Sequence, residues 1–232
     1  LLLFLTSCSN SSEEFIENSV PEIFPDYTNL TIPYNIAPLN FVIKEEGRKF
    51  NVKISSKVGK EIILKKSSPG FEIPIDEWAS LLKENQGEEL RIDISVLREG
   101  KWHHYLPIIH QISRDSIDPW LVYRLVQAVY LKWKDMGIYQ RNLTNFEELP
   151  IIQNSSVENG CMNCHSFAAR NPEKMMLHFR IFNSGTLIWN EGKLSKVDTK
   201  TEKALSAGIY PSWHPGAKHI AFSTGKLNPH LT

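Results

Sequence analysis

The residues with the clearest chemical potential lie together in the second half of the chain, where Cys161, Cys164 and His165 form the pattern Cys-Met-Asn-Cys-His. Two thiols three positions apart can reach the two vinyl groups at one edge of a porphyrin and form thioethers. The adjacent imidazole then lies beneath the ring, where a neutral nitrogen binds iron. In a chain of this composition the pattern would arise by chance about 0.001 times. The motif therefore predicts one covalently attached haem c.

Three other uses of the cysteine pair stay open. A redox dithiol has the same spacing, although no thioredoxin-like βαβ pattern is visible around it. Zinc accepts two thiolates but needs two further ligands, and beyond His165 the sequence offers only distant histidines. A structural disulfide is the third use, if the compartment is oxidising.

A second axial ligand would decide what such an iron does. Histidine or methionine there favours electron transfer, whereas an open position lets a small molecule bind. Met175, Met176 and His178 follow His165 by ten to thirteen residues. We expect His178 to be the sixth ligand, because apolar residues flank it in a strand-like run, and Met175 or Met176 are the alternatives. The competing interpretation makes the methionines core residues and His178 a hydrogen-bonded strand residue.

The third cysteine lies near the N-terminus, in Leu5-Thr6-Ser7-Cys8. The apolar run before it is far shorter than the roughly 20 residues that span a membrane, which favours the end of a signal peptide. A small residue before the cysteine is typical of a bacterial lipobox, and the polar residues that follow suit a tether. We expect Cys8 to carry a lipid that anchors the chain in a bacterial cell envelope, facing the periplasm or the exterior. An ordinary signal peptide with an incidental cysteine is the alternative.

The amino-acid composition limits the classes of partner that we expect the chain to bind. Hydrophobic residues make up 41% of the chain and charged residues 22%, which favours a folded body over a disordered one. Lys plus Arg equals Asp plus Glu, at 26 each, so no basic field is available to hold nucleic acid. We therefore expect a membrane partner through the lipid and a redox or protein partner in the envelope, and no nucleic acid.

Residues 30–113 predict a β-sandwich. The preceding residues 1–29 are expected to hold the signal-peptide remnant, the lipobox and the tether. Short apolar runs at 39–43, 50–54, 62–64 and 90–96 are separated by glycine-containing turns, and two of them alternate at period two. A short helix is expected at 75–82, with Asp76 placed to cap it.

Residues 114–175 predict the helical segment that carries the haem. Asp118-Pro119 is a strong helix start, and apolar residues then recur at steps of three and four through Trp133. The helix is expected to end near Gly137. Residues 139–160 show little periodicity and are expected to form an irregular connection into the cysteine motif.

Residues 176–232 return to a strand-like pattern, at 177–181, 185–189, 193–197 and 210–223. The last run, with Tyr210-Pro211-Ser212-Trp213 and Ile220-Ala221-Phe222, resembles the repeat of TolB-type β-propellers. Its turn, His214-Pro215-Gly216-Ala217, departs from the usual Ser-Pro-Asp-Gly of that family. Only one such repeat is visible, and a single blade cannot bury its own faces, so we expect part of a truncated propeller or a hairpin only.

Four stretches together resemble the TolB-like propeller lipoproteins of Bacteroidetes that carry a Cys-x-x-Cys-His segment. They are the lipobox from Leu5 to Cys8, Ile32 to Phe41, Cys161 to Phe167, and Trp213-His214-Pro215-Gly216. The resemblance implies an order of parts: anchor, β-sandwich, haem-bearing segment and propeller. The expected fold is mainly β with a helical segment.

Three functions follow from these expectations. The first is an envelope electron carrier, which is not itself an enzyme. The second is a binding or scaffold lipoprotein in which the cysteine pair is structural or redox-active without haem. The third is a haem-dependent sensor or catalyst with an open sixth position. No paired carboxylates, nucleophile elbow or phosphate loop favours hydrolysis or phosphoryl transfer.

Overall fold

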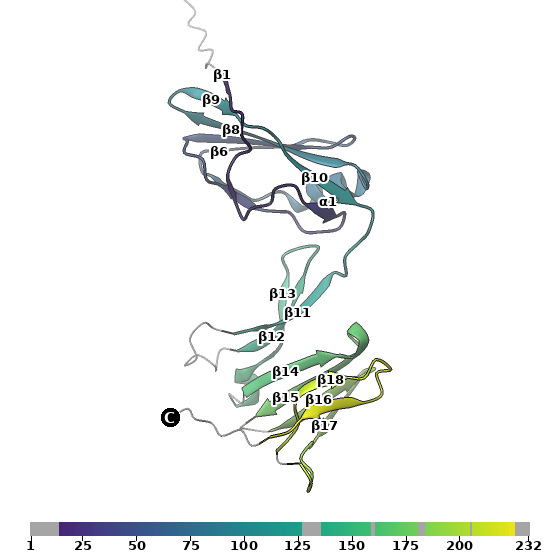
Figure 1. The fold of residues 1–232 in the computed structure, drawn as a ribbon. Helices are drawn as coiled ribbons and strands as arrows, with labels where there is room; N and C mark the ends of the chain where they lie inside the picture. The colour runs from purple at the N-terminus through teal and green to yellow at the C-terminus, as the bar shows by residue number, and fades with distance from the viewer. Residues whose placement is uncertain (1–13, 127–135, 159–160, 181–183, 205, 226–232) are drawn as a thin grey trace, which may run out of the picture. The chain divides into compact units, whose positions relative to one another are not determined.

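A computed structural model of the chain describes residues 14–126, 136–158, 161–180, 184–204 and 206–225. For residues 161, 163, 164 and 180 it describes the backbone only. The expected lipidation site Cys8 and the distal part of the predicted helix lie outside these residues. The chain divides after Trp120 into two compact units, with the loop 142–147 assigned to the first (Figure 1). The described residues are mainly strand, with one α-helix, and none of their sheets closes on itself.

A seven-stranded sheet forms one layer of the N-terminal unit. The long strand β8 pairs with β5 along one edge and with β9 and β10 along the other, all antiparallel. Short strands β1 and β3 extend the sheet in parallel with β9 and β10. The strands are β1 (Glu14–Ile16), β3 (Thr31–Pro33), β5 (Lys49–Ser55), β6 (Ile62–Lys66), β8 (Glu89–Arg98), β9 (Lys101–His104) and β10 (Ile108–Ser113).

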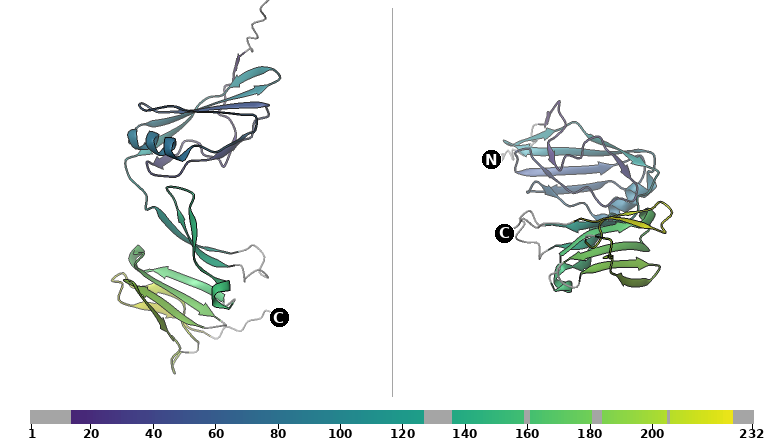
Figure 2. Two further views of the ribbon diagram at one scale, coloured as in Figure 1. Left: turned by 180° about the vertical axis from the view of Figure 1, so that it is seen from behind. Right: turned by 60° about the horizontal axis from the view of Figure 1, so that its bottom comes forward.

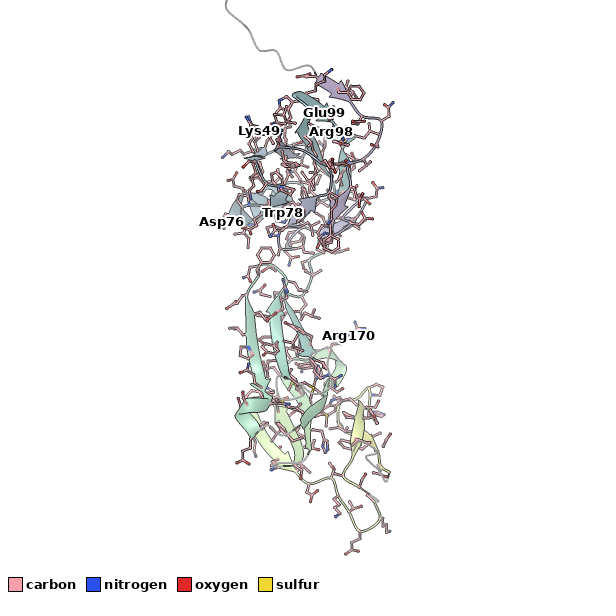
Figure 3. The ribbon with its side chains drawn as sticks, turned by 90° about the vertical axis from the view of Figure 1, so that its left-hand side faces the viewer. Lys49, Asp76, Trp78, Arg98, Glu99 and Arg170 are labelled. Atoms are coloured by element: carbon pink, nitrogen blue, oxygen red, sulfur yellow. The ribbon has the colours of Figure 1, made fainter. Side chains whose placement is uncertain are left out.

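A second, three-stranded sheet and one helix cover the core of this unit. The sheet runs β2 (Ile23–Phe24), β4 (Phe41–Ile43) and β7 (Gly70–Phe71), and the helix is α1 (Ile75–Glu84). Every second residue of β8 is buried, as the period of a strand requires, and these side chains share one apolar cluster with both sheets and the helix. Trp78 of α1 (Figure 3) is buried in that cluster. Its indole N–H donates to the carbonyl oxygen of Ile36 at 2.9 Å.

The expectations for this unit are confirmed at four of its elements. Strands β5, β6 and β8 occupy the predicted runs, and α1 occupies the predicted helix. The predicted cap at Asp76 is wrong, because Pro74 precedes the helix with extended backbone and no side chain caps it. Asp76 lies in the first turn, exposed, where its negative charge still interacts favourably with the helix dipole (Figure 3).

The described residues of the C-terminal unit form three sheets. The central one is a four-stranded meander in which each strand pairs with the next along the chain (Figure 2). The first sheet is β11 (Trp120–Leu125), β12 (Gly137–Asn142) and β13 (Glu148–Gln153). The meander is β14 (Cys161–Phe167), β15 (Lys174–Arg180), β16 (Gly185–Asn190) and β17 (Lys193–Val197), and the last sheet is β18 (Ile209–Trp213) and β19 (Ile220–Ser223).

The predicted helix after Asp118-Pro119 is wrong in its described part, which forms strand β11. Tyr123 stacks on Tyr139 of β12, with ring centroids 6.1 Å apart, and donates a hydrogen bond to the Glu148 carboxylate. These cross-strand contacts join residues distant in the sequence, and the local three- and four-residue spacing carries no sign of them. Asp118 does accept a hydrogen bond, from the Trp120 backbone at 2.9 Å, but in a turn that leads into a strand.

The irregular connection expected at 139–160 is likewise wrong, because β12 and β13 form a hairpin there. The predicted runs at 185–189 and 193–197 are confirmed as β16 and β17, and the described part of the run at 177–181 lies in β15. The run at 210–223 overlaps β18 and contains β19. The boundary expected between residues 175 and 176 falls inside β15. The cysteine motif therefore lies in a sheet rather than in a helical segment.

Candidate functional site

A bulge in strand β14 decides where the two cysteines of the motif lie. Cys161 is opposite Arg180 of β15 and Cys164 is opposite His178, with the register shifted between Met162 and Cys164. Without a bulge, residues three apart in a strand fall on opposite faces. The extra residue restores the phase, because positions 180 and 178 are two apart on the partner strand. Cys161, Cys164 and His178 therefore occupy positions on the same face of the sheet.

His165 occupies the other face, opposite Leu177 of β15. Its ring is half-buried and lies edge-on to the ring of Phe167, with centroids 6.4 Å apart. Burial, and secondarily the positive charge of Arg124, lower the pKa of His165 below its usual value. The imidazole is therefore neutral at pH 7, which is the form that binds iron.

These positions fit a covalent haem in one respect and conflict with it in another. Both cysteine positions share a face, as two thioethers to one porphyrin edge require. Cys164 and His165 alternate between faces, because adjacent residues of a paired strand point in opposite directions. His165 can therefore ligate the iron of a haem held by Cys164 only if the backbone at 164–165 leaves the ladder with β15.

His178 lies deep in the meander, with 2% of its surface exposed. Its Nδ1 shares a hydrogen bond of 3.0 Å with Oγ1 of Thr186, the residue directly opposite on β16. Thr186 is also fully buried. A buried side-chain pair of this kind holds the imidazole in one orientation.

The methionines expected as alternative ligands are both at least half-buried. Met175 is half-buried against a cluster formed by Ile138, Met162, Leu177 and Phe179. Met176 is buried at a position on the opposite face, two residues from His178. In this register Met176 and His178 share a face with the cysteine positions, and Met175 shares a face with His165.

Three features of the site were missed by reasoning from the sequence: the bulge at Asn163, the partner Thr186 and the nearby cation Arg124. Arg124 fell within the predicted helix, so its side chain had no expected neighbour in the motif. Thr186 belongs to a strand that was predicted, but its pairing with His178 depends on the register of β15 and β16. A strand register is set by contacts between residues distant in the sequence. The sequence near Arg124 or Thr186 therefore carries no signal that these residues lie near the motif or His178.

Among the described side chains, which do not include those of Cys161 and Cys164, no three metal-ligating groups come together. In the described part of the chain, no helix has the length and apolar character needed to cross a membrane. Comparisons with protein-family models, with curated proteins and with solved structures find no match to this chain.

Proposed function

We propose that this chain is a cell-envelope lipoprotein that carries one covalent haem c in its C-terminal unit and transfers electrons. Cys161 and Cys164 would form the thioethers, and His165 would be the proximal iron ligand. The observation that carries this proposal is the Cys-Met-Asn-Cys-His motif, with both cysteine positions on one face of the meander. When bound, haem supplies one-electron chemistry between two oxidation states of iron.

The state of His165 supports its role as a ligand. Burial and Arg124 keep the imidazole neutral, so a ring nitrogen can bind iron without first losing a proton. Ligation requires residues 164 and 165 to leave the strand pairing with β15. His178 is our first candidate for the sixth ligand and Met175 or Met176 the alternatives. Joint ligation by His165 and His178 requires the same rearrangement, because paired strands hold them on opposite faces.

We further propose that the meander is one blade of a TolB-like propeller. Four antiparallel strands in sequence order are the unit of that fold. The four central residues of β15, from Met176 to Phe179, are all buried, which is typical of a sheet covered on both faces. The β18–β19 hairpin lies beside β14, where the indole N–H of Trp213 donates to the carbonyl oxygen of Ser166 at 3.2 Å.

Anchoring and partners follow from the N-terminal sequence. Cys8 would carry the lipid and hold the chain at a membrane surface facing the periplasm or the cell exterior. Covalent haem attachment takes place on that side of the inner membrane, so the two parts of the proposal require the same compartment. The partner would be a redox protein of the envelope.

A second candidate function is a scaffold lipoprotein without haem, in which the cysteine pair is structural or redox-active. The observation that favours it is the alternation of Cys164 and His165 between the two faces of a paired strand. Such a strand contributes to the sheet without presenting both residues to one ring.

Haem retention after denaturation separates the two functions. The Cys8→Ser chain is expressed with a c-type maturation system, denatured and separated by electrophoresis. We expect haem to stay with the polypeptide, to be lost in the Cys161→Ser, Cys164→Ser double variant, and to be retained in His178→Ala. A chain with both thiols intact that retains no haem under these conditions contradicts the electron-carrier proposal.

A further inference from the structure

Strand β6 lies at one edge of the seven-stranded sheet of the N-terminal unit. Among the described strands it pairs only with β5, which in turn pairs with the central strand β8. An edge strand presents a row of unpaired N–H and C=O groups, and these groups can pair with a strand of another chain. The free side of β6 is therefore a surface to which a further strand can be added.

Hydrogen bonds of β8 show which of its residues face β5. The N–H of Tyr105 donates to the carbonyl oxygen of Ile94 at 3.2 Å, and the N–H of Ile112 donates to that of Glu88 at 2.9 Å. The main-chain groups of successive residues point to alternate sides of a strand. Even-numbered residues of β8, Ile94 among them, therefore face β9 and β10, and odd-numbered residues face β5.

The same alternation, followed across β5, turns the main-chain groups of Ile63 and Lys65 to the free edge. Val52 of β5 is opposite Ile94, which faces away from it, so Val52 faces β6. Leu64 of β6 is opposite Val52 and faces back towards β5. Its neighbours on either side, Ile63 and Lys65, therefore present their N–H and C=O groups outward.

The side chains along this edge carry charges in a self-complementary order. Glu61, Ile63 and Lys65 are exposed on the outer face of the sheet, with Ile63 at 57%, whereas Ile62 is buried in the core. If two β6 strands pair antiparallel with Ile63 opposite Ile63, Glu61 of each copy is opposite Lys65 of the other. Charged residues on an edge ordinarily oppose pairing, but here opposite charges meet. A shift of the register by two residues loses both matches.

The carboxylate of Glu61 is already held on the outer face. It lies 2.9 Å from the ammonium group of Lys53, a residue of the neighbouring strand β5. The side chain is therefore fixed on the face where Lys65 of a second copy would meet it.

Two other lysines come opposite each other in this register, Lys60 of one copy and Lys66 of the other. Both are engaged within their own chain. The ammonium group of Lys60 lies 3.7 Å from the Glu77 carboxylate, and that of Lys66 donates to the carbonyl oxygen of Gly70 at 3.1 Å. These contacts reduce the repulsion between the two lysines.

We propose that two copies of the chain associate by antiparallel pairing of their β6 strands, with Ile63 at the centre of the pair. The two seven-stranded sheets then form one continuous sheet. Because the contact is confined to one short strand from each copy, it buries less surface than a stable dimer needs, and we expect a dissociation constant in the micromolar range. This inference goes beyond the proposed function and does not depend on haem.

The test is sedimentation equilibrium of the full Cys8→Ser chain, kept reduced, over the micromolar range of concentration, where we expect a monomer–dimer equilibrium. Glu61→Lys and Lys65→Glu should each weaken association at least about tenfold, because like charges then meet in both pairs. An equimolar mixture of these two variants should associate again as a heterodimer, because every lysine is then opposite a glutamate. Glu202→Lys and Lys203→Glu, the same changes at exposed residues of the C-terminal unit, are the matched controls and should have no more than about a twofold effect.

A chain that stays monomeric over this range overturns the proposal. A mixture of the two variants that associates no more tightly than either variant alone also overturns it. Association of the mixture requires both variants to be folded, so misfolding of a variant cannot produce the expected result.

Amide hydrogen exchange reads the backbone contact directly and leaves the β6 sequence unchanged. Exchange at Ile63 and Lys65 should slow as the concentration of the chain rises, because their N–H groups become bonded to the second copy. The amide of Leu64, which faces β5, should exchange slowly at every concentration. Association that leaves exchange at Ile63 and Lys65 unchanged would place the contact on another surface and overturn the proposal.

Discussion

His178 and Thr186 lie opposite each other on β15 and β16, and their side chains share a hydrogen bond of 3.0 Å in a fully buried setting. This contact joins β15, which pairs with the motif-bearing strand β14, to its other neighbour β16. Removing the hydroxyl of Thr186 would withdraw the partner of a buried ring nitrogen, at a cost of roughly 1 to 3 kcal/mol.

Thr186→Val tests this contact because valine keeps the shape of threonine without its hydroxyl. We expect the free energy of unfolding, measured from amide exchange in β15, to fall by roughly 1 to 3 kcal/mol. Thr186→Ser keeps the hydroxyl and should lose no more than about 1 kcal/mol, the contribution of one methyl group. Equal losses in the two variants would show that the hydroxyl does not hold His178.

The iron ligands proposed for the haem-loaded chain are tested by its absorption spectrum. His165→Ala should keep the haem attached through the thioethers and shift the spectrum, because the proximal ligand is lost. If His178 is the sixth ligand, His178→Ala should convert low-spin ferric iron to high-spin. Met175→Leu and Met176→Leu test the two alternative ligands while they preserve packing volume. A spectrum unchanged in all three of these sixth-position variants would reject all three candidates.

His110 of β10 should make the N-terminal unit sensitive to acid. Its side chain is 1% exposed, its Nδ1 accepts a hydrogen bond from the Leu30 backbone at 3.3 Å, and burial lowers its pKa. The unfolded chain, with a histidine pKa of about 6.5, then binds more protons than the folded chain. The stability from His110 is fully present above about pH 6.5 and is lost as the pH falls below that value.

This acid sensitivity can be measured as the slope of unfolding free energy against pH, from amide exchange in β8 and β10 between pH 7.5 and 5. His110→Leu should reduce the slope by at most one proton, about 1.4 kcal/mol per pH unit. His219→Gln, which changes an exposed histidine, is the control and should not alter this slope. A slope that is the same with and without His110 would contradict the prediction.

Tyr105 should ionise late in an alkaline titration. Burial, and then the negative charge of Glu45, raise its pKa to about 12, and its hydroxyl donates to the Glu45 carboxylate at 3.1 Å. Because the folded pKa exceeds the unfolded value of about 10, the linked stability is present below pH 10 and is lost as the pH rises towards 12.

Ultraviolet difference spectra should therefore show a late tyrosinate transition that is missing in Tyr105→Phe. Glu45→Gln should move this transition to lower pH, because it removes a negative charge beside the phenol. A late transition that persists in Tyr105→Phe would assign it to another tyrosine.

Local pattern alone determined several elements of this protein. The alternation of apolar and polar residues in β5 and β8 follows from a strand with one face on a core, and that period is visible within a few residues. The same holds for α1, where three buried residues recur at helical spacing. The Cys161 to His165 motif is also local, since its chemistry depends on covalent spacing, and it stays a prediction of haem.

Only the tertiary structure decided that residues 120–125 form a strand and not a helix. It also decided on which face of the sheet each residue of the cysteine motif lies. The apolar residues of β11 satisfy a helical and an extended arrangement equally, and contacts of Tyr123 with Tyr139 and Glu148 favour the strand. The bulge at Asn163 likewise places positions 161 and 164 on the same face as His178, with His165 on the other face. Both outcomes depend on pairing between segments far apart in the chain. The free energy of such pairing depends on the residues of both strands, so the sequence of one strand alone does not predict it.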